Sequence, residues 1–237
     1  IHTHFKVSRQ IIVQISDHLK GIIITSLGVI ILSPDRLLIR LLNTDTWTAI
    51  FWRGLVFSIG IFILMLVIYR QNTLKQFKKI GKAGVLIGII FGISSFFFTA
   101  SIQNTSIANT LVIIATAPVF ASLFSWLFLK EKVHLRTWIA MLIIFAAIAI
   151  IMSNSFSSDG LLGDLYALGT AVFMATSFTL TRRYKEINMV PAMVISGFVA
   201  AIISGFIISQ TTGSYHLDNE VIPVLILGGL VVTIAFA

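Results

Sequence analysis

Two oppositely charged side chains, Asp35 and Arg53, interrupt long apolar stretches of this chain and are its first candidates for chemistry. The turn between these stretches is centred near Thr44, and each residue lies nine positions from it (44 − 35 and 53 − 44). In an antiparallel helical hairpin the two would therefore share one depth. A charge at the centre of a membrane helix costs about 2.5–3.5 kcal/mol, and such residues commonly mark transport paths. Two interpretations stay open: an ion pair that only locks the hairpin, or a charged wall of a substrate path whose carboxylate carries a coupling proton.

Four further residues could shape or line such a path. Pro34 directly precedes Asp35, and proline removes a helix hydrogen bond and frees a carbonyl group. Pro118 interrupts another apolar stretch in the same way. Broken helices present backbone groups to substrates in transporters, and a kink that only improves packing is the alternative. Gln103 and Asn109 belong to a polar cluster at a turn, where helix capping is a sufficient explanation for most members. Asn109, one turn inside the next apolar stretch, is the better candidate for hydrogen bonding in a cavity.

The rest of the sequence carries no pattern typical of catalysis or of cofactor binding. It has no P-loop, no HExxH or GxSxG motif, and no cysteine. His2 and His4 form an HxH pair, which is too few ligands for a metal site. The net charge of +8 is dispersed over short loops, which argues against a nucleic-acid partner. We therefore expect no enzyme activity, cofactor or metal.

The elements that must position these residues are transmembrane helices. The chain is 57% hydrophobic and only 11% charged, whereas soluble domains carry about 25% charged residues. A span needs about 20 mostly apolar residues. Eight segments are predicted to span: 21–42, 46–69, 83–102, 106–129, 137–153, 161–181, 189–209 and 221–237. The predicted fold class is an all-α integral membrane protein, a bundle of eight transmembrane helices.

The basic residues are sorted between alternate gaps of these spans. Of the 17 Lys and Arg residues, all but Arg36, Arg40 and Arg53 lie before the first span or in every second gap. Cytoplasmic loops keep an excess of Lys and Arg. The sorting predicts a multi-pass protein of the cell (inner) membrane with a cytoplasmic N-terminus. Residues 1–20 form a cytoplasmic segment that could lie along the membrane interface as an amphipathic helix.

A faint internal repeat appears when the chain is shifted against itself by roughly 140 residues, which places Gly54 on Gly197. Spans one to three then match spans six to eight. A unit of five helices crosses the membrane an odd number of times, so its second copy is inverted, as in many secondary transporters. We expect residues 21–153 to form the first repeat and 161–237 an incomplete second one. The chain would then be a C-terminally truncated piece of a ten-helix (5+5) protein.

Three stretches resemble one transporter family. They are NTSIANTLVIIATAPVFASLFSWLFLKEKVHLRTWIAMLI at 104–143, FWRG at 51–54 and LLGDLYAL at 161–168. They resemble the fourth, second and sixth helices of EamA-like members of the drug/metabolite transporter superfamily, and the resemblance covers about residues 20 to 237. It implies ten helices in two repeats, export of a small metabolite, and a role for Pro118 in shaping the cavity.

The sequence thus predicts a secondary transporter that moves a small metabolite (amino-acid-like, amine or drug-like) by alternating access. Its partners would be the lipid bilayer and the solute, and a coupling proton and a homodimer stay open. One alternative is a structural or regulatory membrane protein without transport. Another is a membrane-embedded lipid-modifying enzyme, which would need an interfacial cluster of acidic and histidine residues that His134 or His216 alone does not supply.

Overall fold

The computed structural model describes most of the chain: residues 19, 22–23, 26–41, 44–130, 135–155, 160–211, 215–217 and 221–235. These residues form helices joined by turns, with no strand among them. The predicted interfacial segment 1–20 lies outside the described residues except for Leu19, as do Glu131 and His134.

Described helical residues lie within each of the eight predicted spans. After a helical stretch at 26–32 come α2 (Asp35–Leu41), α3 (Thr46–Tyr69), η1 (Arg70–Asn72), α4 (Thr73–Lys79), α5 (Gly81–Asn104), α6 (Ile107–Ile114), α7 (Ala117–Leu129), α8 (Leu135–Ser155), α9 (Leu161–Arg183), α10 (Val190–Thr211) and α11 (Val221–Ala235). Five described helical stretches, which begin at Thr46, Gly81, Ile107, Leu161 and Val190, are long and apolar enough to cross a membrane. Two shorter apolar helices lie within α8 and α11. The prediction of an all-α membrane protein is confirmed.

Two of the predicted spans are not continuous helices. The first breaks at Ser33 and Pro34, between the helical stretch at 26–32 and α2. Proline causes this break because it has no N–H to donate and its ring collides with the preceding turn. The span predicted at 106–129 divides into α6 and α7 at Ala115 and Thr116. Pro118 lies in the first turn of α7, where a helix tolerates proline because the N–H groups there have no intrahelical partner.

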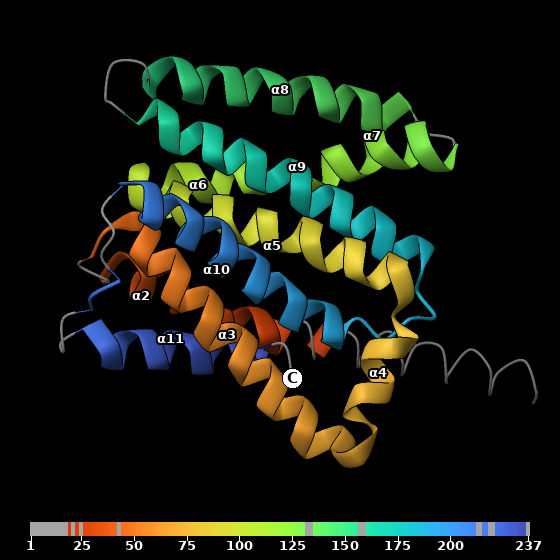
Figure 1. The fold of residues 1–237 in the computed structure, drawn as a ribbon. Helices are drawn as coiled ribbons and strands as arrows, with labels where there is room; N and C mark the ends of the chain where they lie inside the picture. Colours follow the sequence, from red (N-terminus) through yellow and green to blue (C-terminus); the bar gives the residue numbers. More distant parts are fainter. Residues whose placement is uncertain are drawn as a thin grey trace, which may run out of the picture.

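Most of the described helices begin and end at two opposite ends of the bundle (Figure 1). At one end lie α4, the end of α7 and the α9–α10 turn, which carry sorted Lys and Arg residues that the structure describes. There the Asn188 side chain donates a 2.7 Å hydrogen bond to the Tyr69 hydroxyl. At the other end, Trp52 Nε1 donates to the Tyr215 carbonyl over 3.1 Å. The charge sorting in the sequence is therefore a sorting between two ends of the folded chain.

At the centre of the bundle, α3 and α10 cross at Gly54 and Gly197. A Cβ on Gly54 would lie 2.7 Å from the Gly197 carbonyl oxygen, and one on Gly197 would lie 2.6 Å from the Gly54 carbonyl oxygen. The next contacts are also reciprocal, because Gly54 faces Ala201 while Gly197 faces Ser58. Both pairs of equivalent positions are separated by 143 residues (197 − 54 and 201 − 58). Reciprocal contacts of this kind arise between elements related by a two-fold axis, and glycine permits the close backbone approach.

Candidate functional site

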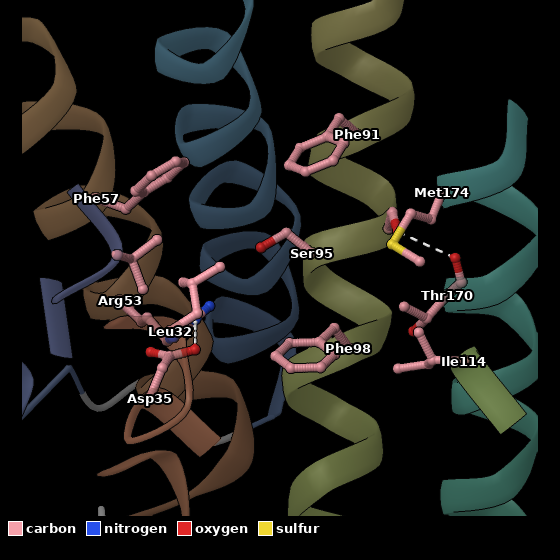
Figure 2. Close-up of a pocket in the computed structure, with 12 residues that line it drawn as sticks. Leu32, Asp35, Arg53, Phe57, Phe91, Ser95, Phe98, Ile114, Thr170 and Met174 are labelled. Carbon is pink, nitrogen blue, oxygen red and sulfur yellow. Dashed lines mark hydrogen bonds and ion pairs between the residues drawn. The ribbon is translucent and has the colours of Figure 1, made fainter. Parts of the chain in front are cut away.

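A cavity of about 230 Å³ lies beside this central crossing, where the two broken spans meet α3, α5, α9 and α11 (Figure 2). Leu32 and Asp35 line it from either side of the first break, and Ile114 lines it at the end of α6, next to the second break. The other lining residues are Arg53, Phe57, Phe91, Ser94, Ser95, Phe98, Thr170, Met174 and Val232. The breaks thus place helix ends against a largely apolar chamber.

The charged residues of the cavity form an ion pair. Arg53 Nη2 donates to Asp35 Oδ2 over 2.7 Å, and the side chains are only 14% and 6% exposed, respectively. Arg53 Nη1 also donates to Thr99 Oγ1 over 3.3 Å, and the guanidinium carbon lies 6.0 Å from the centre of the Phe98 ring. These contacts tie α2 to α3 and α5. The pair is neutral as a whole, which lowers the cost of placing two charges in an apolar bundle.

One face of α5 supplies the opposite wall of the cavity. Phe91, Ser95 and Phe98 follow each other at helical spacing, and Figure 2 shows the Ser95 hydroxyl between the two rings. The neighbouring Ser94 Oγ donates to the Thr170 carbonyl over 3.1 Å, which joins α5 to α9. The cavity therefore combines aromatic surface with a few hydroxyl groups and one ion pair, a composition typical of small-molecule sites.

The structure separates the six sequence-predicted site residues into two groups. Asp35 and Arg53 form an ion pair and both line the cavity, which fits either interpretation of this pair, a contact that only locks the hairpin or a charged wall of a substrate path. Pro34 and Pro118 lie at the helix breaks with exposed side chains, and neither lines the cavity. Gln103 and Asn109 lie outside its lining as well.

Asn109 belongs to a separate buried cluster around Asp164, at the end of the bundle where α5 and α6 meet. Thr105 Oγ1 donates to Asp164 Oδ1 over 2.7 Å, and Asn109 Nδ2 lies 3.4 and 3.5 Å from the two carboxylate oxygens. Asp164 is fully buried in the first turn of α9. Gly163 lets α9 approach this turn, because a Cβ there would lie 2.5 Å from the Asn104 backbone. The cluster fastens α9 to the α5–α6 turn.

Sequence reasoning missed the α5 face and the role of Asp164. The spacing of Phe91, Ser95 and Phe98 was a usable signal, because it puts three residues on one helix face. Asp164 was detectable as an acidic residue in an apolar segment. Neither pattern identifies the helix that the face or the carboxylate contacts.

The chain is similar in sequence to known transporters. It is 32% identical to Solute carrier family 35 member G1 of Mus musculus over 148 residues, 54% of this chain and 39% of that protein. The Homo sapiens protein of the same name is 29% identical over 42% of this chain and 30% of its own length. A riboflavin transporter of Vibrio cholerae is 26% identical over 52% of this chain and 41% of that protein. The chain therefore matches less than half the length of each of these curated relatives.

No solved structure matches the chain. The model of the EamA-like transporter family matches residues 19–153. That segment is more than half of the chain, and it contains both broken spans, the Asp35–Arg53 pair and the α5 wall of the cavity. The chain belongs to the EamA-like transporter family.

Proposed function

We propose that this chain is part of a secondary transporter that carries a small metabolite through the cavity between its helices. The observation that carries the proposal is the place of that cavity, at the breaks of two spans and beside a buried ion pair. Discontinuous helices around a site near the membrane midplane are a recurrent feature of secondary transporters. The family assignment and the named activities of the similar proteins support the same class.

Alternating access would use the two repeats, residues 21–153 and 161–237, as moving halves. The reciprocal contacts of Gly54 and Gly197 support two related halves on either side of the α3–α10 crossing. The helix packing supports this too, because α5 packs on α9 and α10 while α11 packs on α2 and α3. We propose that the protein lies in the inner membrane of the cell and that the end with the sorted basic residues faces the cytoplasm. Transport would then run outward, from the cytoplasm.

The cavity limits the class of solute. Its volume of about 230 Å³ is smaller than the roughly 300–1,000 Å³ of typical ligand pockets, which favours a compact solute. The lining offers aromatic rings, hydroxyl groups and one neutral ion pair. Amino-acid-like and amine solutes fit this composition, since an aromatic wall accepts their apolar part or a cationic group. Asp35 is the proposed carrier of a coupling proton.

Counterflow in proteoliposomes tests the proposal. The purified protein would be reconstituted with an excess of unlabelled solute inside, and uptake of labelled amino acids, amines and riboflavin would be measured. Riboflavin is included because it is the named cargo of the Vibrio cholerae relative. We expect at least one compact amino acid or amine to accumulate transiently. A Ser95→Phe variant, which fills the cavity from α5, should abolish that exchange, whereas Ser209→Phe at an exposed site on α10 should retain it.

Two results would contradict the proposal. One is the absence of counterflow for every solute from a protein that is monodisperse and thermally stable, which would favour a structural or regulatory role. The other is equal exchange by the Ser95→Phe and Ser209→Phe variants, which would place the path outside this cavity.

A further inference from the structure

The Asp35–Arg53 pair also borders a second, much smaller cavity. This space of about 10 Å³ lies between α2, α3 and α11, where Leu38, Leu225 and Gly228 line it. It is about the space that one water molecule requires. A water molecule in such a place also needs two to four polar partners.

The ion pair supplies two such partners. Asp35 Oδ1 and Arg53 Nε are both buried, and the residues that the structure describes provide neither with a hydrogen-bond partner. Nε and Nη2 lie on the same edge of the guanidinium group, and a carboxylate normally takes both N–H groups of that edge through its two oxygens. Here only the bond from Nη2 to Oδ2 is made, so Nε–H and Oδ1 form the open half of a two-bond pairing.

Oδ1 faces the small cavity from α2. A Cβ built on Gly228 would lie 3.9 Å from this oxygen and 3.9 Å from Leu38 Cβ, with no closer atom. Gly228 therefore leaves open the space next to the carboxylate, and no tight backbone contact explains a glycine here. Gly229, the next residue, differs, since a Cβ there would collide with Val56.

We propose that this cavity is a binding site for a single water molecule, which accepts a hydrogen bond from Arg53 Nε and donates one to Asp35 Oδ1. The water completes the ion pair. It also gives the carboxylate a hydrated neighbour outside the larger, solute-sized cavity. Because leaving a buried polar atom without a hydrogen-bond partner is costly, the water stabilises the Asp35–Arg53 ion pair. The proposal concerns the pair itself and is independent of which solute the protein moves.

Substitution of Gly228 distinguishes a cavity that holds water from an empty one, because the melting temperature changes in opposite directions in the two cases. In a wet cavity the methyl group of Gly228→Ala displaces the water, and the melting temperature falls on the order of 4 °C. Gly228→Ser places a hydroxyl group where the water was, and its melting temperature stays near the wild-type value. In a dry cavity Gly228→Ala fills empty space and improves helix propensity, so the melting temperature rises and Ser gives no advantage over Ala.

X-ray hydroxyl-radical labelling of the wild-type protein provides a second measurement. Radicals form where water is bound, so Leu225 should be labelled faster than Ile208, which is also buried, and Gly228→Ala should remove the difference. The proposal requires both results. A melting temperature of Gly228→Ala at or above the wild-type value overturns it, and so does equal labelling of Leu225 and Ile208 in the wild-type protein.

Discussion

The separate costs of removing Asp35 and of removing Arg53 should add up to more than the cost of removing both side chains together. The two side chains are 6% and 14% exposed and 2.7 Å apart, so little water is present to screen a charge left alone. Truncating one partner of a buried pair destabilises by about 3–5 kcal/mol, because the other charge remains uncompensated. We therefore expect Asp35→Ala and Arg53→Ala each to fall in this range. The double variant should be less destabilised than their sum by about 2–3 kcal/mol.

The assay is reversible unfolding in mixed micelles with increasing SDS, followed by circular dichroism, for the four members of the cycle. Asp45→Ala serves as the matched acidic control. Its exposed carboxylate caps α3 through the backbone N–H groups of Trp47 and Thr48, and its loss should cost about 0.5–2 kcal/mol. Combined with Arg53→Ala, this control should be additive. Additive costs for Asp35→Ala and Arg53→Ala would refute the reasoning, since they would mean that neither charge depends on the other.

The same double variant separates a structural from a functional role of the pair. If the pair lines the path, the double variant folds but no longer exchanges solute in proteoliposomes. Exchange at the wild-type rate by the double variant would restrict the pair to holding α2 against α3.

Two further predictions concern helix contacts, and both use unfolding in mixed micelles. Gly54→Ala should destabilise the protein by about 1–3 kcal/mol, because its Cβ would lie 2.7 Å from a backbone oxygen of α10. Gly205→Ala is the control, since the atoms nearest to its Cβ, 3.2 Å away, belong to a phenylalanine ring that can move. Equal effects of the two substitutions would contradict a tight crossing of α3 and α10 at Gly54. Thr105→Val should cost about 1.5–3 kcal/mol through the lost hydrogen bond to the carboxylate of Asp164. Thr179→Val is the control, because it loses only a hydrogen bond to a carbonyl of its own helix. If the unfolding free energies of the two variants differed by less than about 0.5 kcal/mol, the Asp164 cluster would not hold α9 to the α5–α6 turn.

The extent of several spans follows from the sequence because it depends on the length and composition of the apolar segments. The span predicted at 46–69 coincides with α3, and the one predicted at 83–102 lies within α5, which extends it by two residues at each end. An apolar segment of this length can satisfy its backbone groups in a membrane only as a helix. The alternation of basic gaps likewise determines which turns share an end of the bundle. Counting residues from the turn at Thr44 was enough to place Asp35 and Arg53 at one depth, because each helical residue advances by a constant 1.5 Å.

Rotation about each helix axis was decided only by the tertiary structure. Asn109 is polar and lies in the first turn of α6, and its side chain lies toward Asp164 on α9 and not toward the cavity. Spans that are apolar on every side carry little information about which face meets a neighbour, since lipid and protein interior are similarly apolar. The choice instead comes from close contacts between elements far apart in sequence, such as Gly54 with Gly197 and Gly163 with the Asn104 backbone. Sequence patterns alone thus establish that this protein is a multi-pass membrane protein and that Asp35 and Arg53 share one depth. Only packing determined that the two broken spans and one face of α5 enclose a cavity around the ion pair.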